Sequence, residues 1–180
     1  MGLLENVDIS ALSLVKYPDP VLMEVCRPVS AVDERIGRLA RRMFEVMYSS
    51  RGVGLAAPQV GVPIRLFVAN PSDQPGEQEG VYVNPEIVAA CGSEVGEEGC
   101  LSLPMVTCKV KRATQVTVRA TDLEGRPFEH SAEGLLARVF QHEMDHLNGI
   151  LLSDRMSPVA RLANRRTLKE LREEYAAGTG

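Results

Sequence analysis

The chain has 180 residues, of which 44% are hydrophobic and 24% are charged. This length and composition predict one folded domain over residues 1–180 and exclude a chain that is disordered throughout. No stretch approaches the roughly 18 consecutive apolar residues that a membrane-spanning helix needs, so we expect no membrane segment. The 20 basic and 24 acidic residues give a net charge of −4, which argues against a dedicated DNA-binding protein.

Residues 33–50 carry the apolar periodicity of a helix. The apolar residues recur at steps of three and four and share one face: Ile36, Leu39, Ala40, Met43 and Met47. Ser30 and Asp33, just before this face, resemble a capping box. We therefore expect a helix that begins here and ends before Gly52.

Several short segments after this helix have the composition of strands: residues 64–69, 87–91, 106–110, 115–120 and 126–130. In the third segment apolar and polar residues alternate, which is typical of a half-buried strand. Turn-forming residues 122–125 separate the last two segments and predict a β-hairpin. Residues 71–80 contain no large apolar residue and are expected to form a surface loop.

Two helices are expected near the end of the chain. The first runs from about Ala132 to Leu147, with Ser131 as a candidate N-cap and Asn148-Gly149 as its stop. The second runs over about 158–175 and has proline in its first turn. A helix, then strands, then two helices indicates an α+β fold with a mainly antiparallel sheet.

The helix over 132–147 carries the sequence His142-Glu143-Met144-Asp145-His146. Residues four apart lie one turn apart on the same face, so both imidazoles can bind one divalent ion. Glu143 lies at the edge of that face, where it can act on a water as a general base. The alternative interpretation is a helix that carries two surface histidines by chance.

Leu135 and Val139 continue the face of the two histidines toward the start of the helix. A metal site on this face would open onto an apolar wall, as a pocket for a hydrophobic side chain requires. Plain core packing explains the two residues equally well. Asp145 lies off the face and is expected to pair with a base such as Arg112.

Three sources for the third metal ligand can be considered in the sequence. The metzincin pattern H-E-x-x-H-x-x-G-x-x-H fails at its last position, which is Leu152. A later helix offers carboxylates, namely Glu170, Glu173 and Glu174. Cys100 offers a thiolate, and Gly99 before it allows a close approach of the backbone; a Cys-His-His set would leave a fourth position open for water.

Residues 52–61, GVGLAAPQVG, are rich in small residues. Val53 between two glycines can expose its backbone to an extended peptide, and the amide of Gln59 can donate to a developing oxyanion. Considered alone, the segment fits a tight turn between a helix and a strand at least as well.

Together and in this order, the three segments resemble the motifs of the peptide deformylase family. The motifs are present as GVGLAAPQ (52–59), EGCLS (98–102) and HEMDH (142–146), with no departure at a motif position. The similarity extends from about Leu12 to Pro158. The resemblance implies a fold in which antiparallel sheets pack around a central helix that bears the HEMDH motif, followed by a C-terminal helix.

The resemblance also implies an activity and its residues. The enzyme would remove the formyl group from the formyl-Met of newly made polypeptides and release formate. Independently of the resemblance, the stretch MGLLENVDIS has acidic residues and no basic ones, unlike a secretory signal, so we expect a cytoplasmic location. Cys100, His142 and His146 would bind one divalent ion, usually Fe²⁺, with Zn²⁺, Ni²⁺ or Co²⁺ able to replace it. Glu143 would act as the base on the metal-bound water, and Gln59 and the Leu101 N–H would stabilise the oxyanion.

The substrate would lie along residues from all three motif regions. The implied Met pocket is formed by Val53, Leu135, Val139 and His142, and the backbone at Gly54 and Gly99 would pair with the nascent chain. The C-terminal helix is rich in basic residues and would dock on the ribosome, although a solvated surface helix fits as well. Two other functions stay open: an endopeptidase with Glu170 or Glu173 as third ligand, and an inactive family member that binds the ribosome.

Overall fold

The computed structural model describes residues 4–5, 7–72 and 74–178. Part of the N-terminal stretch and one position of the loop 71–80 therefore lie outside the described residues. The helices are α1 (Glu34–Ser49), α2 (Gly134–Leu147), α3 (Pro158–Ala163) and α4 (Arg165–Ala176). The strands are β1 (Gly54–Ala56), β2 (Leu66–Ala69), β3 (Gly80–Cys91), β4 (Glu94–Cys100), β5 (Leu103–Arg112), β6 (Gln115–Thr121) and β7 (Pro127–Glu133).

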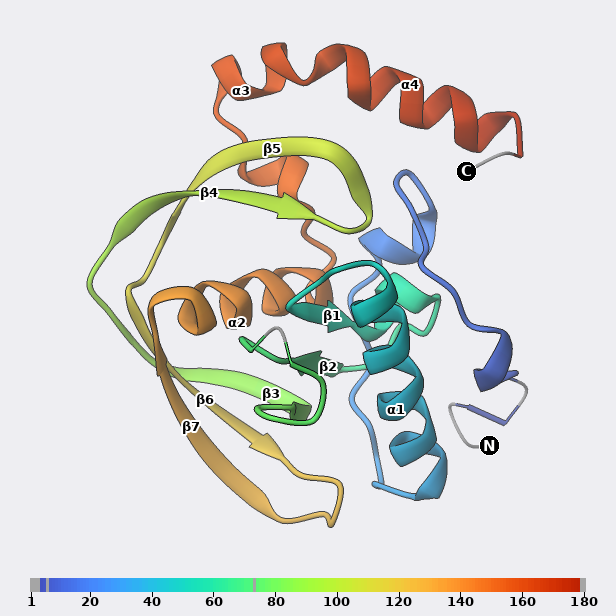
Figure 1. The fold of residues 1–180 in the computed structure, drawn as a ribbon, viewed down its shortest axis with the longest axis vertical. Helices are drawn as coiled ribbons and strands as arrows, with labels where there is room; N and C mark the ends of the chain where they lie inside the picture. Colours follow the sequence, from blue (N-terminus) through green and yellow to red (C-terminus); the bar gives the residue numbers. More distant parts are fainter. Residues whose placement is uncertain (1–3, 6, 73, 179–180) are drawn as a thin grey trace.

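Two antiparallel sheets enclose α2. Five strands form one sheet in the order β1-β2-β3-β6-β7, and β4 pairs with β5 in the other. Figure 1 shows α2 lying between the two sheets, with α1 beside the end of the larger one. The expected α+β fold with mainly antiparallel strands around a central helix is confirmed. Within the described residues, no helix has the length and apolar character needed to cross a membrane.

The apolar side of α2 fixes the helix against the larger sheet. Phe140 and Leu147 are fully buried, and the Phe140 ring packs against Phe67 of β2 and Tyr82 of β3. Burial of large aromatic side chains is a major source of core stability. Because the apolar side of α2 faces the larger sheet, the opposite side of the helix, which carries His142, faces β4 and β5.

Helix α1 confirms the predicted helix but not its cap. The Asp33 side chain accepts hydrogen bonds from the backbone N–H groups of Arg35 and Ile36, so Asp33 itself is the N-cap. The prediction that Ser30 and Asp33 form a capping box was therefore wrong. An acidic N-cap satisfies backbone donors that the first helical turn leaves unpaired.

The start of α2 also differs from the prediction. Residues 131–133 continue β7, and the Ser131 hydroxyl is hydrogen-bonded to Thr117 of β6 at 2.9 Å rather than capping a helix. The helix begins at Gly134, whose φ of +60° allows the chain to turn from strand to helix. The predicted stop is confirmed, since Asn148 is the C-cap and Gly149 has a φ of +70°.

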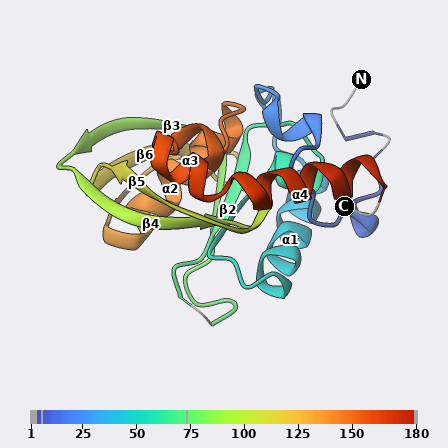
Figure 2. The same cartoon turned by 90° about the horizontal axis from the view of Figure 1, so that it is seen from above.

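The C-terminal segment forms two helices instead of the single one predicted over 158–175. Helix α3 ends at Ala163, and its C-cap residue Asn164 donates a side-chain hydrogen bond to the Thr107 carbonyl of β5 at 3.0 Å. Leu168 and Leu171 of α4 are buried in the apolar cluster that includes β5. Figure 2 shows α4 crossing the top of the molecule.

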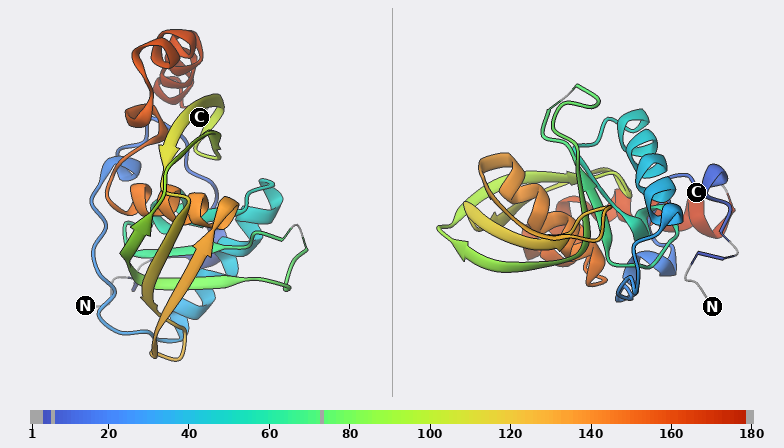
Figure 3. Two further views of the ribbon diagram at one scale, coloured as in Figure 1. Left: turned by 90° about the vertical axis from the view of Figure 1, so that its left-hand side faces the viewer. Right: turned by 90° about the horizontal axis from the view of Figure 1, so that it is seen from below.

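The strand predictions were right in place, but the predicted strand 64–69 was longer than β2 and the other predicted strands were too short. Residues 106–110 alternate between buried and exposed inside β5, as expected, whereas the predicted strand 87–91 is only the end of the long β3. The β6–β7 hairpin is confirmed, and β4 was not predicted as a strand. Residues 74–79 are exposed, and this part of the chain projects from the body of the molecule (Figures 2 and 3).

Candidate metal centre and active site

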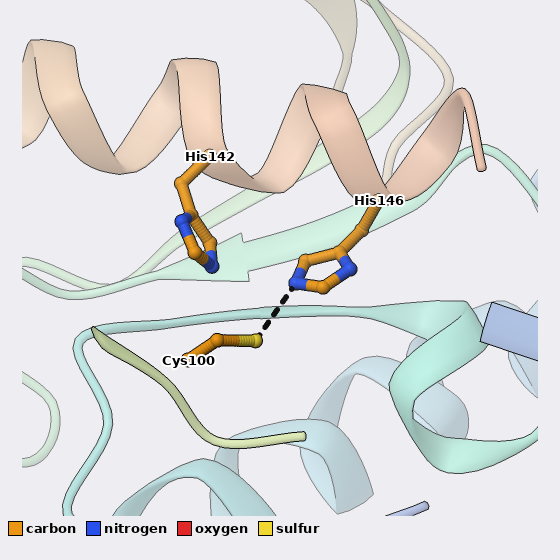
Figure 4. Close-up of side chains that lie close together, drawn as sticks. All are labelled: Cys100, His142 and His146. Carbon is orange, nitrogen blue, oxygen red and sulfur yellow. Dashed lines mark hydrogen bonds between the residues drawn. The ribbon is translucent and has the colours of Figure 1, made fainter. Parts of the chain in front are cut away.

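Three predicted ligands lie together between the small sheet and α2. The Cys100 Sγ is 3.3 Å from Nε2 of His146, and the ligand atoms of Cys100, His142 and His146 all lie within 4.8 Å of one another. Figure 4 shows both imidazoles pointing from α2 toward the sulfur. The spacing of four residues places the two rings on one helical face, as predicted.

Two glycines of the first motif let its chain pass against the other two motifs. A Cβ at Gly52 would lie 2.6 Å from the side chain of Leu101, and one at Gly54 would lie 2.5 Å from Oε1 of Glu143. Real Cβ atoms do not approach so closely, so a side chain at Gly52 would displace that of Leu101, and one at Gly54 would displace that of Glu143. After a register shift at Gly99–Cys100, Cys100 ends β4 opposite Leu103, and Leu101 and Ser102 form the tight turn into β5.

The environment of Cys100 favours its thiolate form. Burial alone would raise the pKa of this thiol, but the neighbouring imidazoles of His146 and His142 outweigh burial and lower the pKa to about 5. A thiolate is the form of cysteine that binds metals. The donor set of one thiolate and two imidazoles suits a divalent ion such as iron or zinc.

Glu98 orients the first histidine. Its Oε2 lies 3.1 Å from Nδ1 of His142, which directs the other ring nitrogen toward Cys100. Burial would raise the pKa of Glu98, but hydrogen bonds from His142, Arg112 and Arg138 hold it well below its usual range. The Nδ1 of His146 is buried and has no hydrogen-bond partner in the described part of the chain, so only Nε2 of this ring is engaged.

A buried ion network supports this arrangement from behind. Arg112 forms ion pairs with Glu98 at 2.9 Å and with Asp145 at 2.7 Å. The predicted pairing of Asp145 with Arg112 is confirmed, and Arg155 pairs with the same carboxylate. Sequence reasoning missed Glu98; its position inside the EGCLS motif, two residues before a candidate ligand, was the available signal.

We expect Arg112→Met to be strongly destabilising. It removes the guanidinium that the carboxylates of Glu98 and Asp145 share and leaves them to Arg138 and Arg155. Breaking a buried pair costs about 3–5 kcal/mol where the charge is left unpaired, so we expect a loss near the lower end of that range. Urea unfolding of the metal-free protein measures the effect. The control is Arg119→Met, which removes an exposed pair with Glu129 and should cost less than about 1 kcal/mol. Equal losses in the two variants would contradict the structural role of the buried network.

Glu143 lies beside the ligand cluster and is 4% exposed. Its Oε2 has no hydrogen-bond partner among the described residues. Burial raises the pKa of this carboxyl to about 7. A base whose pKa lies near neutrality is well suited to take up and return a proton during turnover.

The carboxamide of Gln59 faces the same place. Its Oε1 accepts a hydrogen bond from the Ala56 N–H at 2.9 Å, so its NH₂ group points to Cys100 Sγ at 3.7 Å and to Ser102 Oγ at 3.2 Å. The side chain is buried. This orientation matches a donor aimed at a reacting oxygen.

A cavity of about 410 Å³ opens over these groups. Its lining includes, besides Gln59, Cys100, His142 and Glu143, the other residues predicted around the site: Val53, Gly54, Gly99, Leu101, Leu135 and Val139. The volume is typical of a pocket for a small ligand or side chain. Arg51, Met105 and Thr107 also line the cavity and were not predicted as site residues. Met105 is 90% exposed, so the alternation of apolar and polar residues along β5 could not indicate its position.

Comparison with known proteins agrees with these observations. The sequence profile described as polypeptide deformylase matches residues 11–162. The peptide deformylase of Alkalilimnicola ehrlichii is 46% identical over 94% of this chain and 95% of its own length. The chain belongs to the peptide deformylase family.

Solved deformylase structures have the same fold. The crystal structure of a plant peptide deformylase has a TM-score of 0.91 and 41% identity, covering 95% of this chain and 94% of the plant chain. A deformylase from Legionella pneumophila has a TM-score of 0.85 and 45% identity, covering 92% and 97%. The chain is therefore an enzyme of this family of metal-dependent hydrolases, and the predicted resemblance is confirmed.

The carboxylates considered as alternative ligands lie elsewhere in this deformylase fold. Glu170 and Glu173 are on α4, where they pair with Arg166 and Lys169. Leu152, at the position where the metzincin pattern fails, is buried in the apolar cluster under β5. Among the described residues, Cys100 is the third group that joins the two histidines.

Proposed function

We propose that this chain removes the formyl group from the N-terminal formyl-Met of newly made polypeptides and releases formate. The observation that carries the proposal is the position of Glu143, a buried carboxylate beside a Cys-His-His cluster at the base of an open cavity. Cys100, His142 and His146 would hold one divalent ion, with Fe²⁺ proposed as the physiological metal. When bound, such an ion supplies Lewis-acid activation of water and of the formyl group.

The chain's own residues would handle the proton and the developing charge. Glu143 would accept a proton from water, hold it at the carboxylate, and deliver it to the amine that leaves. The NH₂ group of Gln59 and the backbone N–H of Leu101 would donate hydrogen bonds to the oxygen that becomes negatively charged. Each such donor typically contributes a factor of about 10²–10³ to the rate.

The sheet topology supports an added peptide strand. Within the described residues β1 pairs only with β2, and β4 pairs only with β5, so each presents a free edge. Gly54 of β1 and Gly99 of β4 both line the cavity. An extended nascent chain would pair with these edges, and its Met side chain would lie against Val53, Leu135, Val139 and His142.

Two further expectations accompany the function. A cytoplasmic location is supported by the four cysteines, which are all free. Docking of the C-terminal helices on the ribosome stays a prediction. Two of their basic residues, Arg161 and Arg172, already donate hydrogen bonds to groups within the protein, which leaves fewer free charges for an anionic partner.

The decisive experiment measures formate release from a formyl-Met peptide by metal-loaded protein, with a chelator-treated sample as control. We expect formate and a free N-terminal Met, with loss of turnover on chelation. Cleavage inside the peptide without formate would indicate the endopeptidase alternative. Full metal loading with neither product would indicate an inactive family member.

A further inference from the structure

Ser102 belongs to the EGCLS motif but has no role in the function proposed above. It lies in the tight turn between β4 and β5 and is 0% exposed. Its hydroxyl oxygen is 3.2 Å from Nε2 of Gln59 and accepts a hydrogen bond from that amide. A buried hydroxyl next to a proposed oxyanion donor can set the donor's orientation.

The Gln59 carboxamide is held at both of its ends. The Ala56 N–H can only donate, so the atom facing it at 2.9 Å must be the carbonyl oxygen, and the NH₂ group is directed to the other side. One of the two hydrogens of that group is bound by Ser102. The second hydrogen is left facing the Cys100 Sγ and the ligand cluster, with Nε2 and Sγ 3.7 Å apart.

The backbones around these two side chains are also tied together. The Val15 N–H donates to the Gln59 carbonyl and the Tyr17 N–H donates to the Ser102 carbonyl, both at 2.8 Å. The segment Val15–Tyr17 therefore bridges the two loops with alternate residues of an extended chain. Arg172 of α4 in turn donates to the Tyr17 hydroxyl at 2.7 Å, which anchors the bridging segment.

We infer that Ser102 is a positioning residue that holds the Gln59 carboxamide with one N–H aimed at the reacting oxygen. The inference rests on the proposed role of Gln59 as an oxyanion donor. Without the Ser102 hydroxyl, the amide keeps its anchor at Ala56 but is free to tilt toward the space that the hydroxyl leaves. A donor contributes to catalysis only when its geometry matches the transition state.

The kinetic test is a double-mutant cycle with Gln59→Ala. We expect Ser102→Ala to lower kcat by about 10-fold, a part of the 10²–10³ that loss of such a donor costs, with KM unchanged. In the Gln59→Ala background the same substitution should have no further effect. The matched control is Ser153→Ala, which removes another buried serine hydroxyl and should leave kcat unchanged. An unchanged kcat in Ser102→Ala, or an equal loss in both backgrounds, overturns the inference.

A second measurement requires neither turnover nor metal. In metal-free wild-type protein, the side-chain N–H signals of Gln59 should be protected from exchange with water, as NMR can measure. Protection should be lost for one of them in Ser102→Ala. Signals in the wild type that exchange with water as fast as those of an exposed glutamine would overturn the inference even if the variant did not fold. If the wild type released no formate, the proposed function would fail. The NMR signals would still show whether Gln59 and Ser102 form the hydrogen bond.

Discussion

Replacing Cys100 by alanine is expected to abolish stoichiometric metal binding and, with it, turnover. The substitution removes the single thiolate from a three-ligand set and leaves two imidazoles, one of them held by Glu98. Disturbing groups that merely orient ligands already costs about 10–100-fold in metal affinity, so losing a ligand should cost more. Metal content per chain after dialysis, together with competition against a chelator of known affinity, measures the loss.

The chain provides a matched control for this prediction. Cys91 is an exposed free cysteine at the end of β3, so Cys91→Ala removes a thiol without touching the cluster. This variant should bind metal like the wild type. If Cys100→Ala also kept one tightly bound ion, the ion would be held without this thiolate, and the assignment of Cys100 as a ligand would be wrong.

The sequence was sufficient for those parts of the site that depend on local geometry. His142 and His146 are four residues apart on one helix, so their common face followed from helical periodicity alone. The alternation of 106–110 likewise placed β5 correctly. The meeting of Cys100 with the histidines depends on a sheet and a helix that are 42 or more residues apart in the chain. The residues alone left Cys100 as one candidate beside the carboxylates of the C-terminal helix, and the resemblance of all three motifs chose between them.

Other features depended on tertiary contacts that a single sequence does not show. Residues 94–100 are acidic and contain two glycines, a composition unfavourable for a strand, yet pairing with β5 makes them one. Ser131 is a reasonable helix cap in isolation, but pairing with β6 continues the strand past it. The ion network around Glu98 joins β4, β5 and α2, so no local pattern could reveal its partners.

Glu143→Ala is expected to retain the metal and lose turnover. The carboxylate does not belong to the ligand cluster, so its removal leaves the thiolate and both imidazoles in place. It is the buried group whose pKa is raised to about 7 and whose Oε2 has no partner among the described residues. Proton transfer by a positioned side chain typically contributes a factor of about 10²–10⁴ to the rate, so kcat should fall by about 10²-fold or more.

Two measurements on one sample separate this result from a loss of structure. Metal content per chain should equal that of the wild type, while formate release from a formyl-Met peptide falls. Glu170→Ala, which removes an exposed carboxylate on α4, should change neither quantity. A Glu143→Ala variant that turns over at the wild-type rate would show that another group moves the proton. Because Cys100→Ala loses the metal and Glu143→Ala keeps it, the two variants together distinguish holding the ion from transferring the proton.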